Sequence, residues 1–125
     1  MTVDTTIKPS HISDVNNIKL KLFESSYKDF TTEMTLYRSI YNSLGPTWID
    51  TCDIDWENMQ IKIKLLHPIE TIGLNTELAI AFENFVSDMF KLGKLSKDEF
   101  DVVRYRSNML FNVVLNCGND VVVTL

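Results

Sequence analysis

The chain has 125 residues and a formal net charge of −5, from 12 Lys and Arg against 17 Asp and Glu. Its length and its 45% share of apolar residues predict a single domain with a hydrophobic core. The acidic balance argues against general nucleic-acid binding, which needs clustered basic side chains, and no segment has the pattern of a signal peptide or a membrane span. We therefore expect a cytoplasmic protein, of a bacterium or a virus-infected cell, that does not bind membranes.

The N-terminal part of the sequence predicts an arm and a first strand. Residues 1–16 are mostly polar and show no hydrophobic period, so we interpret them as an arm that precedes a single domain formed by residues 17–125. From residue 17 to residue 24, aliphatic side chains alternate with polar ones, among them Lys19 and Lys21. This two-residue period predicts a half-buried β-strand.

The next segment has the spacing of an amphipathic helix. Ser25 or Ser26 is a suitable N-cap, and the segment ends at Gly45 followed by Pro46. Apolar residues recur at steps of three and four between these limits, which predicts a helix that buries this stripe. The stripe consists of Tyr27, Phe30, Met34, Tyr37, Tyr41 and Leu44.

A β-hairpin is predicted directly after this helix. Residues 50–56 and 59–65 both alternate apolar with polar side chains, and the phase of the alternation changes between them. A loop at Glu57 and Asn58 explains the change, because it places apolar opposite apolar and polar opposite polar. The predicted pairs are Trp56 with Met59, Asp55 with Gln60, Ile54 with Ile61, Asp53 with Lys62, Cys52 with Ile63 and Thr51 with Lys64.

The C-terminal third predicts a helical hairpin. One helix starts near Thr76 and ends at Gly93, and a second starts at Ser96, where Glu99 completes a capping box. A stripe of polar residues at helical spacing favours continuation of the second helix to about residue 116, followed by a short strand over residues 121–125. The competing interpretation is a second β-hairpin, because valine favours strands and the CGND segment suits a turn.

The charges suggest an order for the three predicted strands. The first strand carries lysines, the second carries Asp53 and Asp55, and the third carries Lys62 and Lys64. Opposite charges on adjacent strands are favourable, so we expect the second strand in the middle, parallel to the first. The predicted fold is a two-layer α+β domain, with a small mixed sheet of order 1-2-3 covered on one face by three helices.

No motif for catalysis or metal binding occurs in the sequence. The acidic residues between the two tryptophans lack the glycine and the distal glutamate of a calcium loop. Cys52 and Cys117 lack metal-ligand spacing, and His11 and His67 have no local catalytic partner. We therefore expect no cofactor, no metal and no catalytic residue, and we consider enzymatic activity the weaker interpretation.

The remaining candidates are binding residues. Trp48 and the charged sheet face of Asp53, Asp55, Lys62 and Lys64 are candidates for contact with a partner protein. Trp56 is more readily explained as core. Arg104 and Arg106 are the alternative candidates, for a small anionic ligand, because guanidinium groups suit phosphate and carboxylate.

The sequence favours a small acidic protein-binding module that acts without catalysis, as an adaptor, inhibitor or assembly factor. The abundance of Asn, Ile, Lys and Asp indicates an AT-rich source, which fits bacteria, phages and large viruses about equally, and we expect a module encoded by a phage or mobile element that modulates its host. Binding or simple hydrolysis of a small anionic ligand or nucleotide is the first alternative, and a structural subunit of a larger assembly, including a homo-oligomer, is the second.

Overall fold

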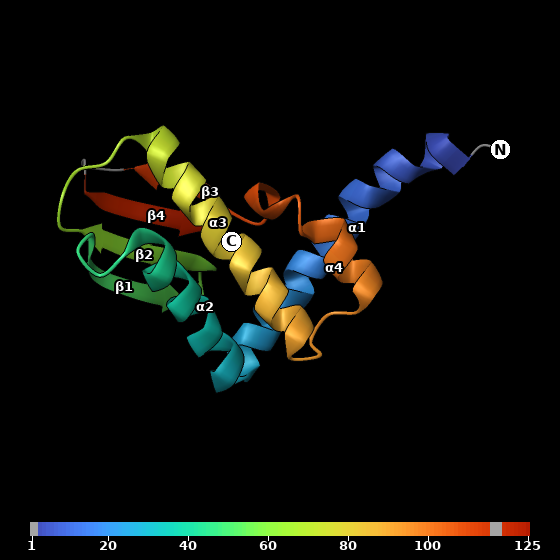
Figure 1. The fold of residues 1–125 in the computed structure, drawn as a ribbon, viewed down its shortest axis with the longest axis horizontal. Helices are drawn as coiled ribbons and strands as arrows, with labels where there is room; N and C mark the ends of the chain where they lie inside the picture. Colours follow the sequence, from blue (N-terminus) through green and yellow to red (C-terminus); the bar gives the residue numbers. More distant parts are fainter. Residues whose placement is uncertain (1–2, 116–118) are drawn as a thin grey trace.

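The computed structural model describes residues 3–115 and 119–125, with side chains described from Asp14 onward. Four helices and a four-stranded antiparallel sheet of order β1-β2-β4-β3 form an α+β fold. Figure 1 shows α2 and α3 on one face of this sheet. The helices are α1 (Val3–Lys28), α2 (Phe30–Leu44), α3 (Thr71–Lys91), α4 (Lys97–Val103) and the short 3-10 helix η1 (Ser107–Met109). The strands are β1 (Ile49–Asp55), β2 (Gln60–Leu65), β3 (Asn112–Leu115) and β4 (Asp120–Thr124).

The β1–β2 hairpin is confirmed with its register. The structure pairs Thr51 with Lys64 and Asp55 with Gln60, and the three predicted pairs between them are also present. The apolar side chains of β2 are buried and its two lysines are exposed, as the alternation requires. At the turn, Met59 has a positive φ of 52°.

The predicted first strand is a helix. Residues 17–24 belong to α1, which also includes most of the segment interpreted as an arm. The buried side chains Val15, Ile18, Leu22 and Ser26 are spaced by three, four and four residues, whereas Leu20 is 65% exposed. A strand that buries Ile18 and Leu22 would bury Leu20 on the same face. Burial in this segment therefore follows the helical period. Ile18 and Leu22 also fit the two-residue period of a strand.

The predicted helix start and the predicted apolar stripe are wrong. Ser26 lies inside α1, and α2 is capped by Asp29, whose carboxylate accepts hydrogen bonds from Thr31 N at 3.0 Å and Thr32 Oγ1 at 3.2 Å. Asp29 therefore marks the boundary between α1 and α2, and the buried face of α2 differs from the predicted one. Of the predicted stripe, the first three members are exposed and only Leu44 is fully buried. The end of α2 at Gly45 is confirmed.

The helical hairpin of α3 and α4 is present in a shorter form. Helix α3 begins five residues before the predicted cap, at Thr71, and Gly93 after its end has a positive φ of 77°. The capping box at Ser96 and Glu99 is confirmed, and the rings of Phe90 and Phe100 stack between the two helices with centroids 4.6 Å apart. Helix α4 nevertheless ends at Val103 instead of continuing.

The C-terminal segment forms the second hairpin rather than a long helix. Strands β3 and β4 pair antiparallel, and β4 also pairs with β2, which places β4 inside the sheet. The predicted order 1-2-3 and its parallel connection are therefore absent, because the lysine-bearing segment is helical and β1 lies at an edge. Of the predicted CGND turn, Cys117 and Gly118 lie outside the described residues, whereas Asp120 belongs to β4.

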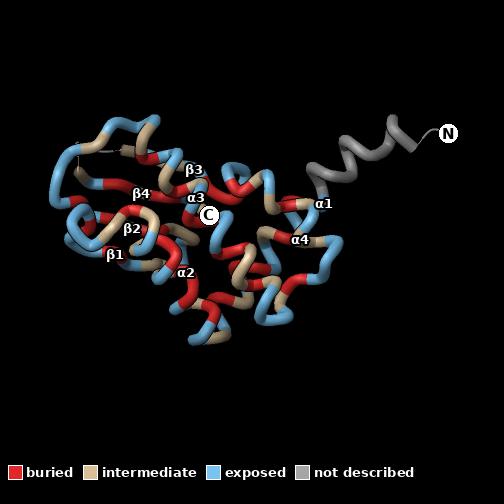
Figure 2. Tube along the Cα trace, viewed as in Figure 1, coloured by how far each residue is buried: buried red, intermediate tan, exposed pale blue. Residues whose placement is uncertain are grey.

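The core lies between the sheet and the helix layer. Val121 and Val123 of β4 are buried on the same face as the aliphatic residues of β2, and Figure 2 shows buried segments in both strands. Phe82 of α3 is the centre of an aromatic cluster, with Phe23 edge-on at 6.2 Å and Phe111 stacked at 4.9 Å. Helix α1 is thereby anchored to the core through Phe23.

Candidate functional site

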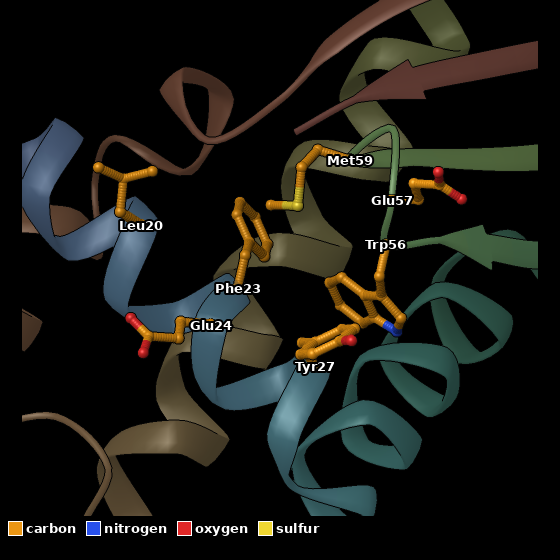
Figure 3. A pocket seen from close by; sticks show the side chains of 7 residues that line it. All are labelled: Leu20, Phe23, Glu24, Tyr27, Trp56, Glu57 and Met59. Atoms are coloured by element: carbon orange, nitrogen blue, oxygen red, sulfur yellow. The ribbon is translucent and has the colours of Figure 1, made fainter.

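A groove of about 700 Å³ separates α1 from the turn between β1 and β2. Its volume is more than twice that of each of four other surface hollows, which measure about 200–310 Å³. Figure 3 shows its walls, with one set of side chains from α1 and the other from the hairpin. We call it the α1–hairpin groove. It is lined by Leu20, Phe23, Glu24, Tyr27, Trp56, Glu57 and Met59.

The α1 wall is an apolar stripe at helical spacing. Leu20, Phe23 and Tyr27 follow at steps of three and four, so they share one face of the helix. Phe23 is buried and fixes the helix against Phe82, whereas Leu20 and Tyr27 are 65% and 66% exposed. Large apolar side chains therefore face solvent from a helix that is held in place by the core.

The hairpin wall is built on a turn held by Asp55. The Asp55 carboxylate accepts from the Asn58 side chain at 2.8 Å and from the Asn58 backbone N at 3.2 Å. Met59 N donates to the Trp56 carbonyl at 3.3 Å, and Leu125 N donates to the Met59 carbonyl at 2.9 Å. The hydrogen bonds from Asn58 hold the pKa of Asp55 below its usual value. Trp56 and Met59 are thus presented by a well-paired turn.

An aromatic contact joins the two walls. The ring centroids of Tyr27 and Trp56 are 6.4 Å apart at an interplanar angle of 80°, the edge-to-face arrangement that aromatic pairs favour. Figure 3 shows the two rings side by side, with Phe23 and Met59 further along the groove. The groove is therefore closed at one side by aromatic rings and open elsewhere.

The charged residues of the lining are both acidic. Glu24 forms an ion pair with Lys28 on the next turn of α1, and this lysine lowers the pKa of Glu24. Glu57 is exposed at the hairpin turn and pairs with no cation among the described residues. The groove therefore has an apolar floor, with the Glu24–Lys28 ion pair at its border on α1 and the Glu57 carboxylate at its border on the hairpin turn.

The predicted charged face is the uncovered face of the sheet. Asp53, Lys62 and Lys64 are exposed there, beside Asp120 of β4, and they border a shallow hollow of about 200 Å³. Asp55 lies at the end of this face with Lys62 Nζ at 3.8 Å. These side chains lie opposite one another across the strands, so the charges are largely matched within the sheet.

The two tryptophans lie at opposite ends of β1. Trp48 precedes the strand, is 36% exposed, and contacts His67 edge-on with ring centroids 5.6 Å apart. It borders a separate hollow of about 240 Å³, so the structure does not bring it to the charged face with which it was grouped. Trp56, interpreted as core from the sequence, is half-buried and lines the α1–hairpin groove.

The arginines proposed for an anionic ligand make internal contacts. Arg104 lies over the Tyr105 ring at 4.4 Å, with Nη1 at 3.9 Å from the Asp101 carboxylate. Arg106 donates from Nη1 to the Val102 carbonyl at 2.9 Å. Both guanidinium groups therefore make contacts within their own segment, and Arg104 Nε is buried without a hydrogen-bond partner among the described residues.

Reactive groups are sparse in the part of the chain that the structure describes. The Cys52 thiol is buried, which raises its pKa to about 12, so it is a poor nucleophile. Within residues 14–115 and 119–125, no three His, Cys, Asp or Glu side chains are close enough together to hold a metal ion. Two residues that the sequence analysis considered for catalysis or metal binding, His11 and Cys117, lie outside the residues whose side chains are described.

The comparisons with known proteins give no relative. No protein-family model matches the sequence, and neither a curated protein nor a solved structure matches the chain. Among the described helices, none is both long enough and apolar enough to span a membrane.

Sequence reasoning missed the α1 wall of the groove. Leu20 lies on the face of the predicted strand that is expected to be buried, and Tyr27 lies in the predicted apolar stripe, yet both are exposed. Their spacing with Phe23 is a helical signal that was present in the sequence, but it becomes a site only when the hairpin turn lies opposite. No local pattern links α1 to a turn about thirty residues further along the chain.

Proposed function

We propose that this chain is a small acidic protein-binding module that acts by docking on another protein and without catalysis. The observation that carries the proposal is the α1–hairpin groove, in which exposed Leu20 and Tyr27 stand beside half-buried Trp56. Protein interfaces derive most of their binding energy from a few aromatic and aliphatic anchors that bury well in a pocket. The groove supplies both the anchors and the pocket.

The framework around the groove supports this role. Phe23 ties α1 to the core, and the hairpin turn is held by the Asp55 carboxylate, so the two walls are ordered before a partner arrives. A preordered surface loses less conformational entropy on binding than a flexible one. We further propose that the module is a cytoplasmic adaptor, inhibitor or assembly factor, encoded by a phage or mobile element, in keeping with its acidic composition and AT-rich residue usage.

The experiment is affinity capture from the source cell with matched variants. Leu20→Asp places a charge in the groove at an exposed position, so the fold should be retained while docking is lost. Ile72→Asp is the control, because Ile72 is an exposed aliphatic residue on α3 outside the groove. We expect a partner that the unmodified chain and Ile72→Asp recover and that Leu20→Asp does not. Equal recovery by all three, or recovery of the chain alone, would refute the proposal.

A further inference from the structure

We infer that the occupant of the α1–hairpin groove is a cationic amphipathic helix of the partner protein. This inference rests on the proposed function, since it specifies the chemistry of the docking partner. It follows from three properties of the groove. Its walls offer few free backbone hydrogen-bonding groups, its apolar side chains have helical spacing, and its border carries acidic residues.

The backbone of the groove walls is already paired. On one side, the wall is a helix, whose N–H and C=O groups bond to one another. On the other side, the turn N–H group of Asn58 donates to the Asp55 carboxylate, and that of Met59 donates to the Trp56 carbonyl. An extended peptide would find no ladder to pair with and would bury its own polar backbone at a cost. A helix satisfies its backbone internally and avoids that cost.

The anchors suit the apolar face of a helix. Leu20, Phe23 and Tyr27 form a ridge along α1, and such ridges pack against the grooves of a second helix. Trp56 and Met59 lie across from this ridge and would cover the far side of the inserted side chains (Figure 3). A volume of about 700 Å³ accommodates several large apolar side chains, which is the usual arrangement when an amphipathic helix docks in a groove.

The border charge selects cations. Glu24 and Glu57 are the charged residues of the described lining, one on each wall. Glu24 is ion-paired with Lys28, Glu57 forms no ion pair with the described side chains, and the whole chain has a formal charge of −5. Lys or Arg side chains that flank the apolar face of the incoming helix would reach these carboxylates. Acidic flanking residues would meet the like charge of Glu57, and the long-range field of the acidic chain would slow their approach.

The test uses two labelled helical peptides of about 18 residues, which is about five turns. Both carry leucines at positions i, i+3, i+4 and i+7, and the remaining positions are mainly lysine in one peptide and glutamate in the other. Fluorescence anisotropy with the full chain measures the dissociation constants. We expect the lysine peptide to bind more tightly than the glutamate peptide by roughly tenfold or more at low salt, with the difference shrinking as salt is added.

Variants of the chain test whether the lysine peptide binds in the groove. Glu24→Gln with Glu57→Gln should weaken the lysine peptide by roughly fivefold, the expectation for two exposed ion pairs. Glu70→Gln with Glu83→Gln makes the same change in charge at exposed positions outside the groove and should have a smaller effect. Leu20→Asp and, as a second anchor variant, Tyr27→Ala should each weaken binding by about tenfold or more. In a Trp48→Phe background, Trp56 fluorescence should change as the peptide binds.

Several results would overturn the inference. Equal binding of the two peptides, or equal effects of the two glutamate pairs, would reject a cationic helix while leaving docking in the groove intact. Tight binding of the neutral dye N-phenylnaphthylamine without peptide binding would indicate a pocket for small apolar molecules. A dimer in light scattering that Leu20→Asp dissociates would identify a second copy as the occupant. If Leu20→Asp also left partner capture unchanged, the proposed function itself would fail.

Discussion

At the scale of single residues, Leu20 and Leu22 distinguish a helix from a strand in the N-terminal part of the chain. Both would lie on one face of a strand, but in α1 they point in different directions, so Leu22 is buried and Leu20 is exposed. Ile18 and Leu22 fit both the two-residue period of a strand and the period of a helix. Burial of Val15 and Ser26 on the same face shows that the helical period continues in both directions.

Alanine substitutions at these two leucines should therefore have unequal effects. Leu22→Ala removes buried methyl groups next to the core and should lower the free energy of unfolding by about 2–5 kcal/mol. Leu20→Ala should change it by less than about 1 kcal/mol, because the side chain is mostly exposed. Urea denaturation of both variants measures the difference. Similar losses at the two positions would contradict the helix and favour the strand.

At the scale of elements, local patterns were predictable where neighbouring residues decide the structure. The β1–β2 register follows from the match of polar with polar side chains across the turn, and the start of α4 follows from Ser96 and Glu99 alone. The end of α4 was not predictable in this way. The polar stripe that suggested a longer helix is also compatible with η1 and β3, and only pairing with β4 stabilises the strand.

The capping box of α4 also links this helix to α1. Glu99 accepts from Lys21 Nζ at 2.8 Å and from Ser96 N at 2.8 Å, and these hydrogen bonds lower its pKa. A carboxylate with a lowered pKa stabilises the fold above its unfolded pKa, near 4.3, and this stabilisation is lost as the pH falls through the folded value. Glu99→Gln should therefore cost roughly 0.2–1 kcal/mol at pH 7, since the pair is partly exposed.

The sign of this dependence is tested by denaturation at several pH values. The difference between the unmodified chain and Glu99→Gln should be constant near neutral pH and should shrink below about pH 4.5, as Glu99 becomes protonated. Glu83→Gln is the control, because Glu83 is exposed and forms no ion pair with the described side chains. A difference that grows on acidification would rule out the proposed role of the Lys21–Glu99 contact.

At the scale of the whole molecule, neither the sheet order nor the groove could be predicted, because both depend on contacts between distant segments. Lysines and aspartates do lie opposite one another on adjacent strands, as expected, but Lys64 of β2 faces Asp120 of β4, a strand that the predicted order does not contain. The groove likewise requires the core to hold α1 opposite the hairpin turn, through Phe23 and Phe82.

The central position of β4 leads to a matched pair of substitutions. Val123 is fully buried between the sheet and the helices, so Val123→Asp would bury a charge and should lower the free energy of unfolding by about 3 kcal/mol or more. Val122 lies on the uncovered face opposite Lys62, so Val122→Asp should cost less than about 1 kcal/mol. Thermal and urea denaturation measure both values. Equal tolerance of the two changes would mean that β4 is not an inner strand, and the core described for this fold would then be wrong.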